Sequence, residues 1–225
     1  MKILIVSATK FEIAPLVESL GMPKVIGINL AKFQTKQHQI DILTTGIGMV
    51  FTTFHLSTLL AKNNYDCAIN AGVAGAIDKS FIIGQVVNVV QDYFYELGAE
   101  DGDAWLNLED LNLLNENDFP YQANGLTNNN FPNLWQINNL KQVSAQTVNK
   151  VHGNFQSIKT MESRTHAQIE SMEGAAFLYC CLHHNLPCAQ IRAISNYVET
   201  RNKANWKMKE AIINLNEFLH SLLFS

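Results

Sequence analysis

Short apolar runs alternate with stretches of helical periodicity along most of this chain. Lys2–Ser7 is a short apolar run that predicts a buried strand. Residues 11–20 then carry apolar side chains at helical spacing, and Gly21 with Pro23 ends that helix. A second apolar helix is expected over Val50–Lys62. Strands that alternate with helices predict an α/β fold with a mainly parallel sheet covered on both faces.

The same alternation continues to the end of the chain. Strands are expected over Lys24–Leu30, Gln39–Thr45, Asp66–Ala71, Gln85–Gln91 and Cys188–Ser195, regular structure over Lys141–Val148, a tight turn over Gly72–Ala76, and helices over Gly174–His184 and Trp206–Leu223. Residues 107–139 are crowded with Asn, Leu and Pro, which predicts an irregular, partly helical surface excursion. Residues 1–225 are expected to form one domain, because a chain of 225 residues fits a domain of ordinary size.

The composition argues against several classes of partner and location. The net charge is −4 with no long block of Lys or Arg, so no nucleic-acid partner is expected. No run of 18 apolar residues is present, so no membrane helix is expected. The four cysteines lie in apolar stretches without a CxxC pair. That pattern favours reduced core residues in a cytoplasmic protein over a disulfide or a zinc site.

Four polar or glycine-rich segments fall where ligands bind in open α/β sheets, beyond the carboxyl ends of the strands. These segments are Ser7–Glu12, Thr44–Gly48, Gly72–Gly75 and Ser195–Arg201. A fifth segment, Glu170–Glu173, comes just before a very apolar helix. Each has a plain structural explanation when it is taken alone. Glu12 and Glu173 are favoured in the first turn of a helix, the glycines suit tight turns, and Asn196 suits a turn at a strand end. The information lies in their order and spacing together.

That constellation resembles the nucleoside phosphorylase/nucleosidase superfamily. The matching motifs are Thr45–Gly48, Asn70–Gly75, Ser171–Ala176 and Arg192–Asn196, after an opening strand that leads into Glu12. Within the superfamily the chain resembles the futalosine hydrolase family, through the segments Glu96–Gly102, Thr147–Asn149 and Ile194–Arg201. The resemblance implies a nucleoside phosphorylase-like, three-layer αβα sandwich with a mixed, mainly parallel sheet. It also implies a homo-oligomer, a dimer or larger.

The resemblance assigns roles to individual residues. Glu12 matches the carboxylate that activates water, and Glu173 matches the carboxylate that accepts hydrogen bonds from the ribose hydroxyls. Asn196 is the third expected catalytic residue and stands at the position that contacts the purine. Substrate contacts are expected from Gly46, Gly48, Val73, Ala74, Gly75, Thr147, Val148, Asn149, Met172, Ser195 and Arg201. No metal or organic cofactor is implied, because carboxylate, amide and water suffice for this chemistry.

Hydrolysis is favoured over phosphorolysis by the distribution of arginine. A phosphorylase must hold a dianionic phosphate, for which the fork of an arginine is well suited. The first 163 residues contain no arginine, and Lys10 offers a single point charge after the first strand. Water is therefore the expected nucleophile.

Two positions depart from the adenine-cleaving relatives. Those have Asp where this chain has Asn196, and an amide cannot donate the proton that N7 of adenine takes. An amide suits hypoxanthine, because it donates to the 6-oxo group and accepts from an N–H, but it leaves the source of the leaving-group proton unassigned. Val73 stands where those relatives have serine in the glycine-rich segment, and nothing in the sequence shows what compensates.

The sequence therefore predicts an N-glycosidic bond hydrolase acting on futalosine, with hypoxanthine as one product. The other half of futalosine is a benzoate on a short linker, and Arg201 or Arg164 is expected to meet it, unless each is a surface salt-bridge partner. Two alternatives remain open. One is another purine nucleosidase or phosphorylase, with inosine-like or methylthioadenosine/S-adenosylhomocysteine substrates. The other is a non-catalytic member that binds or stores nucleosides.

Overall fold

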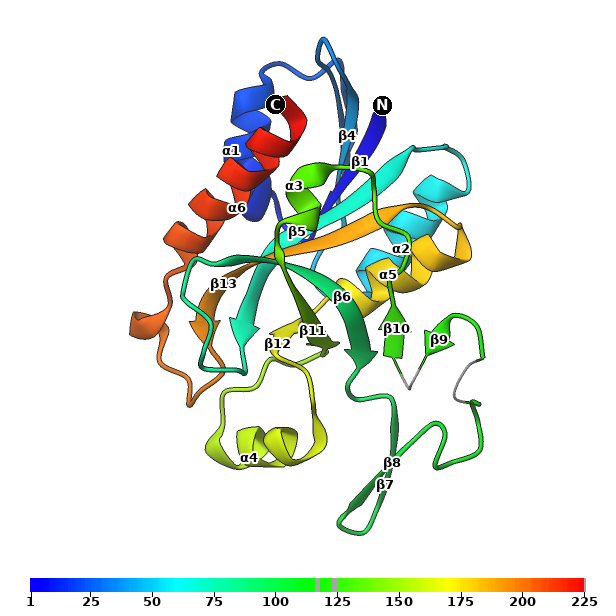
Figure 1. Ribbon diagram of the computed structural model, residues 1–225, viewed down its shortest axis with the longest axis vertical. Helices are drawn as coiled ribbons and strands as arrows, with labels where there is room; N and C mark the ends of the chain where they lie inside the picture. The colour runs from blue at the N-terminus through cyan, green and yellow to red at the C-terminus, as the bar shows by residue number, and fades with distance from the viewer. Residues whose placement is uncertain (116–117, 123–124, 225) are drawn as a thin grey trace.

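The computed structural model describes residues 1–115, 118–122 and 125–224, and its centre is a mixed β-sheet (Figure 1). The strands are β1 (Lys2–Ser7), β2 (Val25–Ile26), β3 (Leu30–Gln34), β4 (Gln39–Thr44), β5 (Cys67–Ala76), β6 (Val86–Phe94), β7 (Gly98–Asp101), β8 (Ala104–Asn107), β9 (Tyr121–Gln122), β10 (Gly125–Thr127), β11 (Lys141–Thr147), β12 (Ile169–Ser171) and β13 (Cys188–Tyr197). The helices are α1 (Lys10–Leu20), α2 (Met49–Leu60), α3 (Trp135–Asn138), α4 (Phe155–Arg164), α5 (Gly174–His183) and α6 (Met208–Phe224), with a 3-10 turn at Lys203–Asn205.

Helices cover both faces of this sheet. Successive side chains of a strand point to opposite faces. In β1, Ile3 and Ile5 accordingly pack with α1 and α6, whereas Leu4 and Val6 pack with α2 and α5. Figure 1 shows the α1–α6 pair on one side of the sheet and the α2–α5 pair on the other. The expected three-layer αβα arrangement is confirmed.

Parallel and antiparallel pairings both occur in the sheet. The parallel ladders join β1 to β4 and β5, β5 to β13, β6 to β11, and β11 to β12. Antiparallel pairs add β2 and β3 at one edge and β9 and β10 at the other, and they also join β12 to β5 and β13 to β6. The order β4-β1-β5-β13 brings the ends of β1, β5 and β13 together.

Two local predictions were wrong. The segment Gly72–Ala76 is not a tight turn but the second half of β5, which pairs with β13 along its whole length. Its small residues are needed because buried side chains pass over the strand there. The expected strand Lys24–Leu30 is instead a hairpin, because the Gly27 N–H donates to the Leu30 carbonyl and turns the chain from β2 into β3.

The segment 107–139 is only partly a surface excursion. Its later half contributes β10 and α3, and Leu126, Asn128 and Ile137 are buried. The Asn128 side-chain amide donates to the Cys188 carbonyl at 2.7 Å, which ties the segment to the start of β13. Residues 116–117 and 123–124 of the predicted excursion lie outside the described residues.

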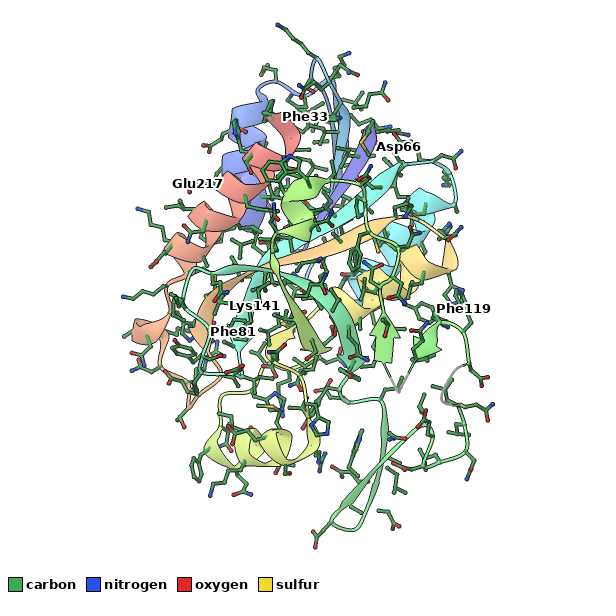
Figure 2. The ribbon with its side chains drawn as sticks, viewed as in Figure 1. Phe33, Asp66, Phe81, Phe119, Lys141 and Glu217 are labelled. Atoms are coloured by element: carbon green, nitrogen blue, oxygen red, sulfur yellow. The ribbon has the colours of Figure 1, made fainter. Side chains whose placement is uncertain are left out.

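Besides the side chains that pack against the helices, a further apolar cluster packs against the sheet. It centres on Phe81, which is buried among residues of β5, β6, β11 and β13. The Lys141 ammonium lies 4.1 Å from the Phe81 ring centroid and closes the cluster toward solvent (Figure 2). None of the helices described here combines the length and apolar character that a membrane span needs.

Candidate active site

Glu12 takes part in the cap of α1, and its carboxylate is buried. Thr9 caps α1 by accepting a hydrogen bond from the Glu12 N–H, and Glu12 Oε2 accepts from the Thr9 N–H at 3.1 Å and from the Thr9 hydroxyl at 2.8 Å. The other oxygen, Oε1, accepts from the Val73 N–H of β5 at 3.1 Å. The side chain is 9% exposed. The cap alone does not explain this placement, because the carboxylate also reaches across to the central strand.

Glu173 lies between β12 and α5 and points toward the start of α2. Its Oε1 accepts from the Gly48 N–H at 2.9 Å, and the residue is 6% exposed. Burial raises the pKa of this carboxyl, the Arg192 charge and the Gly48 hydrogen bond oppose that shift, and the negative charge of Glu12 adds to it. The two predicted carboxylates therefore act on one another within a single buried region.

Arg192 joins this region, and sequence reasoning gave it no role. It lies on β13, is 1% exposed, and its guanidinium donates to Asn70 Oδ1 and, at 3.1 Å, to Gln190 Oε1. A Cβ built on Gly72 would overlap the Arg192 guanidinium and lie 3.0 Å from Glu12 Oε1. The absence of a side chain at Gly72 thus leaves room for the Glu12 carboxylate and the Arg192 guanidinium on the same side of β5. The available signal was an arginine between the apolar residues Ile191 and Ala193 of a predicted strand.

A buried polar network supports the N-terminus of α5, which carries Glu173. Asp92 accepts from the Gln190 amide and from the Thr147 hydroxyl, both at 2.9 Å, and the Thr147 Oγ1 accepts from the Ala175 N–H at 2.8 Å. Burial raises the pKa of Asp92 to about 6. Thr147 was predicted to contact substrate, but its hydroxyl is used within the fold.

Asn196 lies on the far side of β5 from β1. It stands opposite Gly75, and Glu170 of β12 stands opposite the same glycine on the other side. The Asn196 Oδ1 accepts from the Ser195 hydroxyl at 2.7 Å and its Nδ2 donates to the Tyr197 carbonyl at 2.9 Å. A Cβ on Gly75 would lie 3.3 Å from Asn196 Nδ2, so glycine keeps the space beside the amide open.

Glu170 and His152 form a buried pair that sequence reasoning missed. Glu170 accepts from the His152 N–H at 2.9 Å and binds the His152 Nδ1, and it also accepts from the Gln146 amide at 2.9 Å. The His152 ring packs edge-on against Tyr95, with 5.2 Å between centroids. This pair fixes the loop after β11 near the strand ends.

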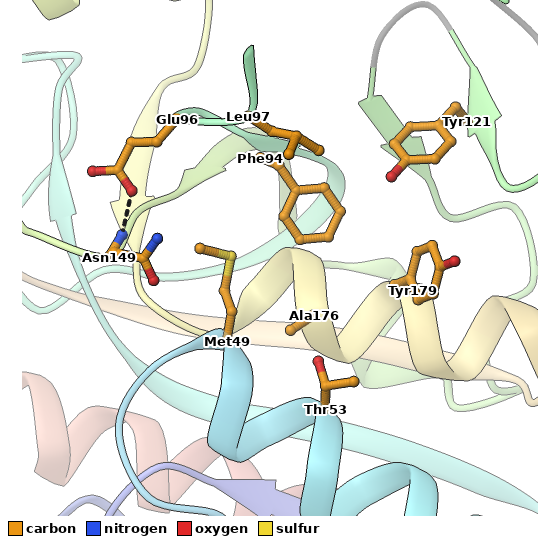
Figure 3. Close-up of a pocket in the computed structure, with 9 residues that line it drawn as sticks. All are labelled: Met49, Thr53, Phe94, Glu96, Leu97, Tyr121, Asn149, Ala176 and Tyr179. Carbon is orange, nitrogen blue, oxygen red and sulfur yellow. Dashed lines mark hydrogen bonds between the residues drawn. The ribbon is translucent and has the colours of Figure 1, made fainter. Parts of the chain in front are cut away.

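A cavity of about 350 Å³ lies beside α2 and α5, and its lining includes neighbours of Gly48 and Glu173 but not Glu173 itself (Figure 3). Met49, which follows Gly48, lines it, and so does Ala176, one helical turn after Glu173. Asn149 also lines it, and its N–H donates to Glu96 Oε2 at 2.8 Å. The aromatic lining residues are Phe94, Tyr121 and Tyr179. The volume falls within the range of about 300–1,000 Å³ that small-molecule sites occupy.

The other predicted residues differ in their placement. Gly46 and Gly48 have positive φ values in the turn before α2. Val148 is buried, and its N–H donates to the Ser171 carbonyl. Ala74 is buried on β5 and Ser195 on β13. Met172 is half-buried beside Glu173. Arg201 is exposed, with its guanidinium 4.9 Å from the Trp206 ring centroid, and does not line the cavity. Among residues 1–115, 118–122 and 125–224, no cluster of His, Cys, Asp and Glu is arranged to hold a metal ion.

Comparison with known proteins agrees with this architecture. A family model described as the phosphorylase superfamily matches residues 140–223. The chain is 33% identical over 184 residues to the futalosine hydrolase of Thermus thermophilus, which covers 80% of each protein. It is 23% identical over 230 residues to the 5'-methylthioadenosine/S-adenosylhomocysteine nucleosidase of Staphylococcus aureus, which covers 97% of each.

Solved structures share the fold. The native futalosine hydrolase of Helicobacter pylori strain 26695 matches with a TM-score of 0.81 at 20% identity, over 99% of this chain and 97% of that one. The methylthioadenosine/S-adenosylhomocysteine nucleosidase of Neisseria meningitidis matches with a TM-score of 0.78 at 16% identity, over 99% and 98%. Both named activities of the sequence relatives are N-glycosidic bond hydrolyses, which favours an enzyme over the storage alternative. The chain therefore belongs to the phosphorylase superfamily, in the family of N-glycosidic bond hydrolases that includes futalosine hydrolase.

Proposed function

We propose that this chain hydrolyses the N-ribosidic bond of futalosine, releasing hypoxanthine and dehypoxanthine futalosine as a step of menaquinone biosynthesis. The observation that carries the proposal is the buried pair Glu12 and Glu173 around the Arg192 guanidinium. The identity to the Thermus thermophilus futalosine hydrolase supports the choice of substrate.

In the proposed reaction Glu12 is the general base. The bond between C1' and N9 breaks, its electron pair leaves with the purine, and water adds to C1' as its proton passes to Glu12. The departing purine anion takes up a proton from solvent to give neutral hypoxanthine. The positive charge that develops on the ribose is stabilised by the nearby carboxylates. The hydrogen bonds from Thr9 and Val73 hold the Glu12 carboxylate in place before the substrate arrives. Arg192 orients the water through its position beside Glu12.

Glu173 and Met172 hold the sugar in this scheme. The Glu173 carboxylate accepts hydrogen bonds from ribose hydroxyls, and its Oε2 is the oxygen that does not bind Gly48. Met172, half-buried in the same segment, packs on the apolar face of the ribose. The turn residues Gly46 and Gly48 allow the backbone to come close to the sugar.

Asn196 reads the purine in this scheme. Ser195 donates to its Oδ1 and thereby orients the amide, which leaves one N–H for the 6-oxo group and an oxygen lone pair for an N7–H. Gly75 has no side chain beside the amide and so leaves space there for the ring. This arrangement suits hypoxanthine better than adenine.

Two further proposals concern the whole protein. The buried free cysteines support a cytoplasmic location. A homo-oligomer is supported by the exposed apolar side chains of the α2 region, Ile47, Val50, Phe51 and Phe54, each more than half exposed. Light scattering tests this assembly: Phe54→Glu should reduce the parent mass to that of a monomer, and an unchanged mass would refute this interface.

The function is tested by chromatographic measurement of base release, with and without phosphate, from futalosine, inosine and methylthioadenosine. Fast release of hypoxanthine from futalosine that does not depend on phosphate is expected. Faster turnover of inosine or methylthioadenosine would instead support another purine nucleosidase, the second candidate that the Staphylococcus aureus relative favours. A requirement for phosphate would overturn the hydrolytic mechanism.

A further inference from the structure

A second cavity, of about 380 Å³, shares a wall with the one beside α2 and α5. Phe94, Leu97 and Tyr121 line both cavities, and Figure 3 shows Leu97 and Tyr121 beyond the Phe94 ring as seen from Met49. The second cavity extends from the end of β6 to the β7–β8 hairpin and the last turn of α4. The two cavities therefore adjoin at these three side chains.

The chemistry of this second cavity is aromatic with one permanent cation. Tyr93, Tyr95 and Trp105 line it together with Arg164, the last residue of α4. The Arg164 guanidinium lies 5.2 Å from the Trp105 ring centroid. Among the lining residues, all of which the structure describes, Arg164 is the one Lys or Arg, and Asp and Glu are absent.

Arg164 is available to bind an anion. Within the described part of the chain, no carboxylate lies within ion-pair distance of its guanidinium. Its neighbours are neutral aromatic side chains, because the guanidinium lies over the Trp105 ring and interacts with the Tyr95 hydroxyl. A guanidinium has five N–H donors, so donors remain for a planar bidentate partner. An arginine in this setting matches a carboxylate, and the aromatic walls match a flat ring.

We propose that this cavity is the subsite for an aryl carboxylate carried on the 5' side of the nucleoside substrate, with Arg164 as its cation. The inference rests on the proposed function, because it places the ribose at Glu173. The linker then passes Phe94, Leu97 and Tyr121, the aryl ring lies among Tyr95 and Trp105, and the carboxylate meets Arg164. Arg201, the other expected cation, lines neither cavity and stacks on Trp206 instead.

The test compares Arg164→Met with Arg201→Met, which removes an equal charge from an arginine that also stacks on a tryptophan. Steady-state kinetics on futalosine and on inosine, which lacks the aryl arm, separate the subsite from the catalytic centre. Arg164→Met should raise the KM for futalosine by about 10- to 100-fold, as expected for a lost charged hydrogen-bonded pair, and leave both kcat and the KM for inosine within about twofold. Arg201→Met should change neither KM.

An equal rise in both KM values for Arg164→Met, no rise at all, or the futalosine-specific rise in Arg201→Met would overturn the subsite. Calorimetric binding of futalosine keeps this test independent of turnover. If the unaltered enzyme does not hydrolyse futalosine, the proposed function fails. The subsite is then judged by whether Arg164→Met weakens futalosine binding by the same factor, and equal affinities would reject it.

Discussion

In the proposed function, Asn196 is the residue that selects the leaving purine. Its amide is fixed by Ser195 and by the Tyr197 carbonyl, so it presents one donor and one acceptor in a defined direction. A carboxyl at the same place would offer a proton to N7 and repel a 6-oxo group. A single substitution at this position should therefore shift the preferred purine.

Asn196→Asp should lower the ratio of kcat/KM for inosine to that for methylthioadenosine by at least about tenfold, because one good hydrogen bond exchanged for a repulsive contact is worth that much. Steady-state assays on the two nucleosides measure the ratio. Asn205→Asp, whose amide binds Glu199 at the surface, is the matched control and should leave it unchanged. A ratio unaltered in Asn196→Asp would remove this residue from base recognition.

The sequence motifs led to Glu12, Glu173 and Asn196, and the structure places each at a strand end or a helix start around β5. Arg192 lies in the motif Arg192–Asn196. Its contact with Asn70 and its proximity to Glu12 depend, however, on Gly72 of β5, a different strand. The hydrogen bonds of Glu12 with Val73 and of Thr147 with Ala175 could not be predicted either, because each joins two different elements. Spacing along a chain predicts which residues share an end of the sheet, but not which ones touch.

At the scale of elements, the N-terminus of α5 has no room for a side chain at Gly174. A Cβ at Gly174 would overlap both the Gln190 Oε1 and the Asp92 Oδ2. Those two side chains also hold Arg192 and Thr147. A methyl group there would force the start of α5, and Glu173 with it, away from Gly48.

Gly174→Ala should destabilise the protein by about 3 kcal/mol, since overpacking of a filled interior costs that order, and should reduce kcat/KM for futalosine. Urea unfolding together with the base-release assay measures both effects. Ala175→Gly, in the same helical turn, adds no atom and should cost about 1–2 kcal/mol, through helix propensity and the loss of one buried methyl group. Equal stability of Gly174→Ala and the parent protein would show that this turn has room to move.

Elements were predicted best where periodicity alone decides them. The strand Lys2–Ser7 and the helix after it were located from their apolar pattern, and the structure confirms both. The glycine-rich half of β5 was predicted as a turn because its local sequence favours a turn, whereas pairing with β13 makes it a strand. Here tertiary pairing outweighs local preference.

At the scale of the whole molecule, the stability of the fold is coupled to the protonation of its buried acids. Burial raises the pKa of Asp92 to about 6, above its ordinary value of 3.8. The folded state therefore holds this proton more tightly than the unfolded state. The resulting stabilisation is complete below pH 3.8 and is lost as the pH rises through 6.

The contribution of Asp92 to the free energy of unfolding should fall by about 3 kcal/mol between pH 3.8 and pH 7. Urea unfolding of the parent and of Asp92→Asn across this range measures it. Because asparagine does not titrate, the free energy of the variant should fall less with pH by this amount, whatever its absolute stability. Parallel pH dependences would contradict the placement of Asp92 as a buried, titrating acid.

The most direct test of the account is base release by Glu12→Gln. The amide keeps the shape and an acceptor oxygen, but it cannot take a proton from water. Hypoxanthine release from futalosine should fall by at least about a hundredfold, as expected for the loss of a general base. Calorimetric Kd for futalosine should stay within about threefold of the parent value, because the groups proposed to bind the sugar and base are untouched. Release at the parent rate would contradict the central claim that the Glu12 carboxylate activates the attacking water.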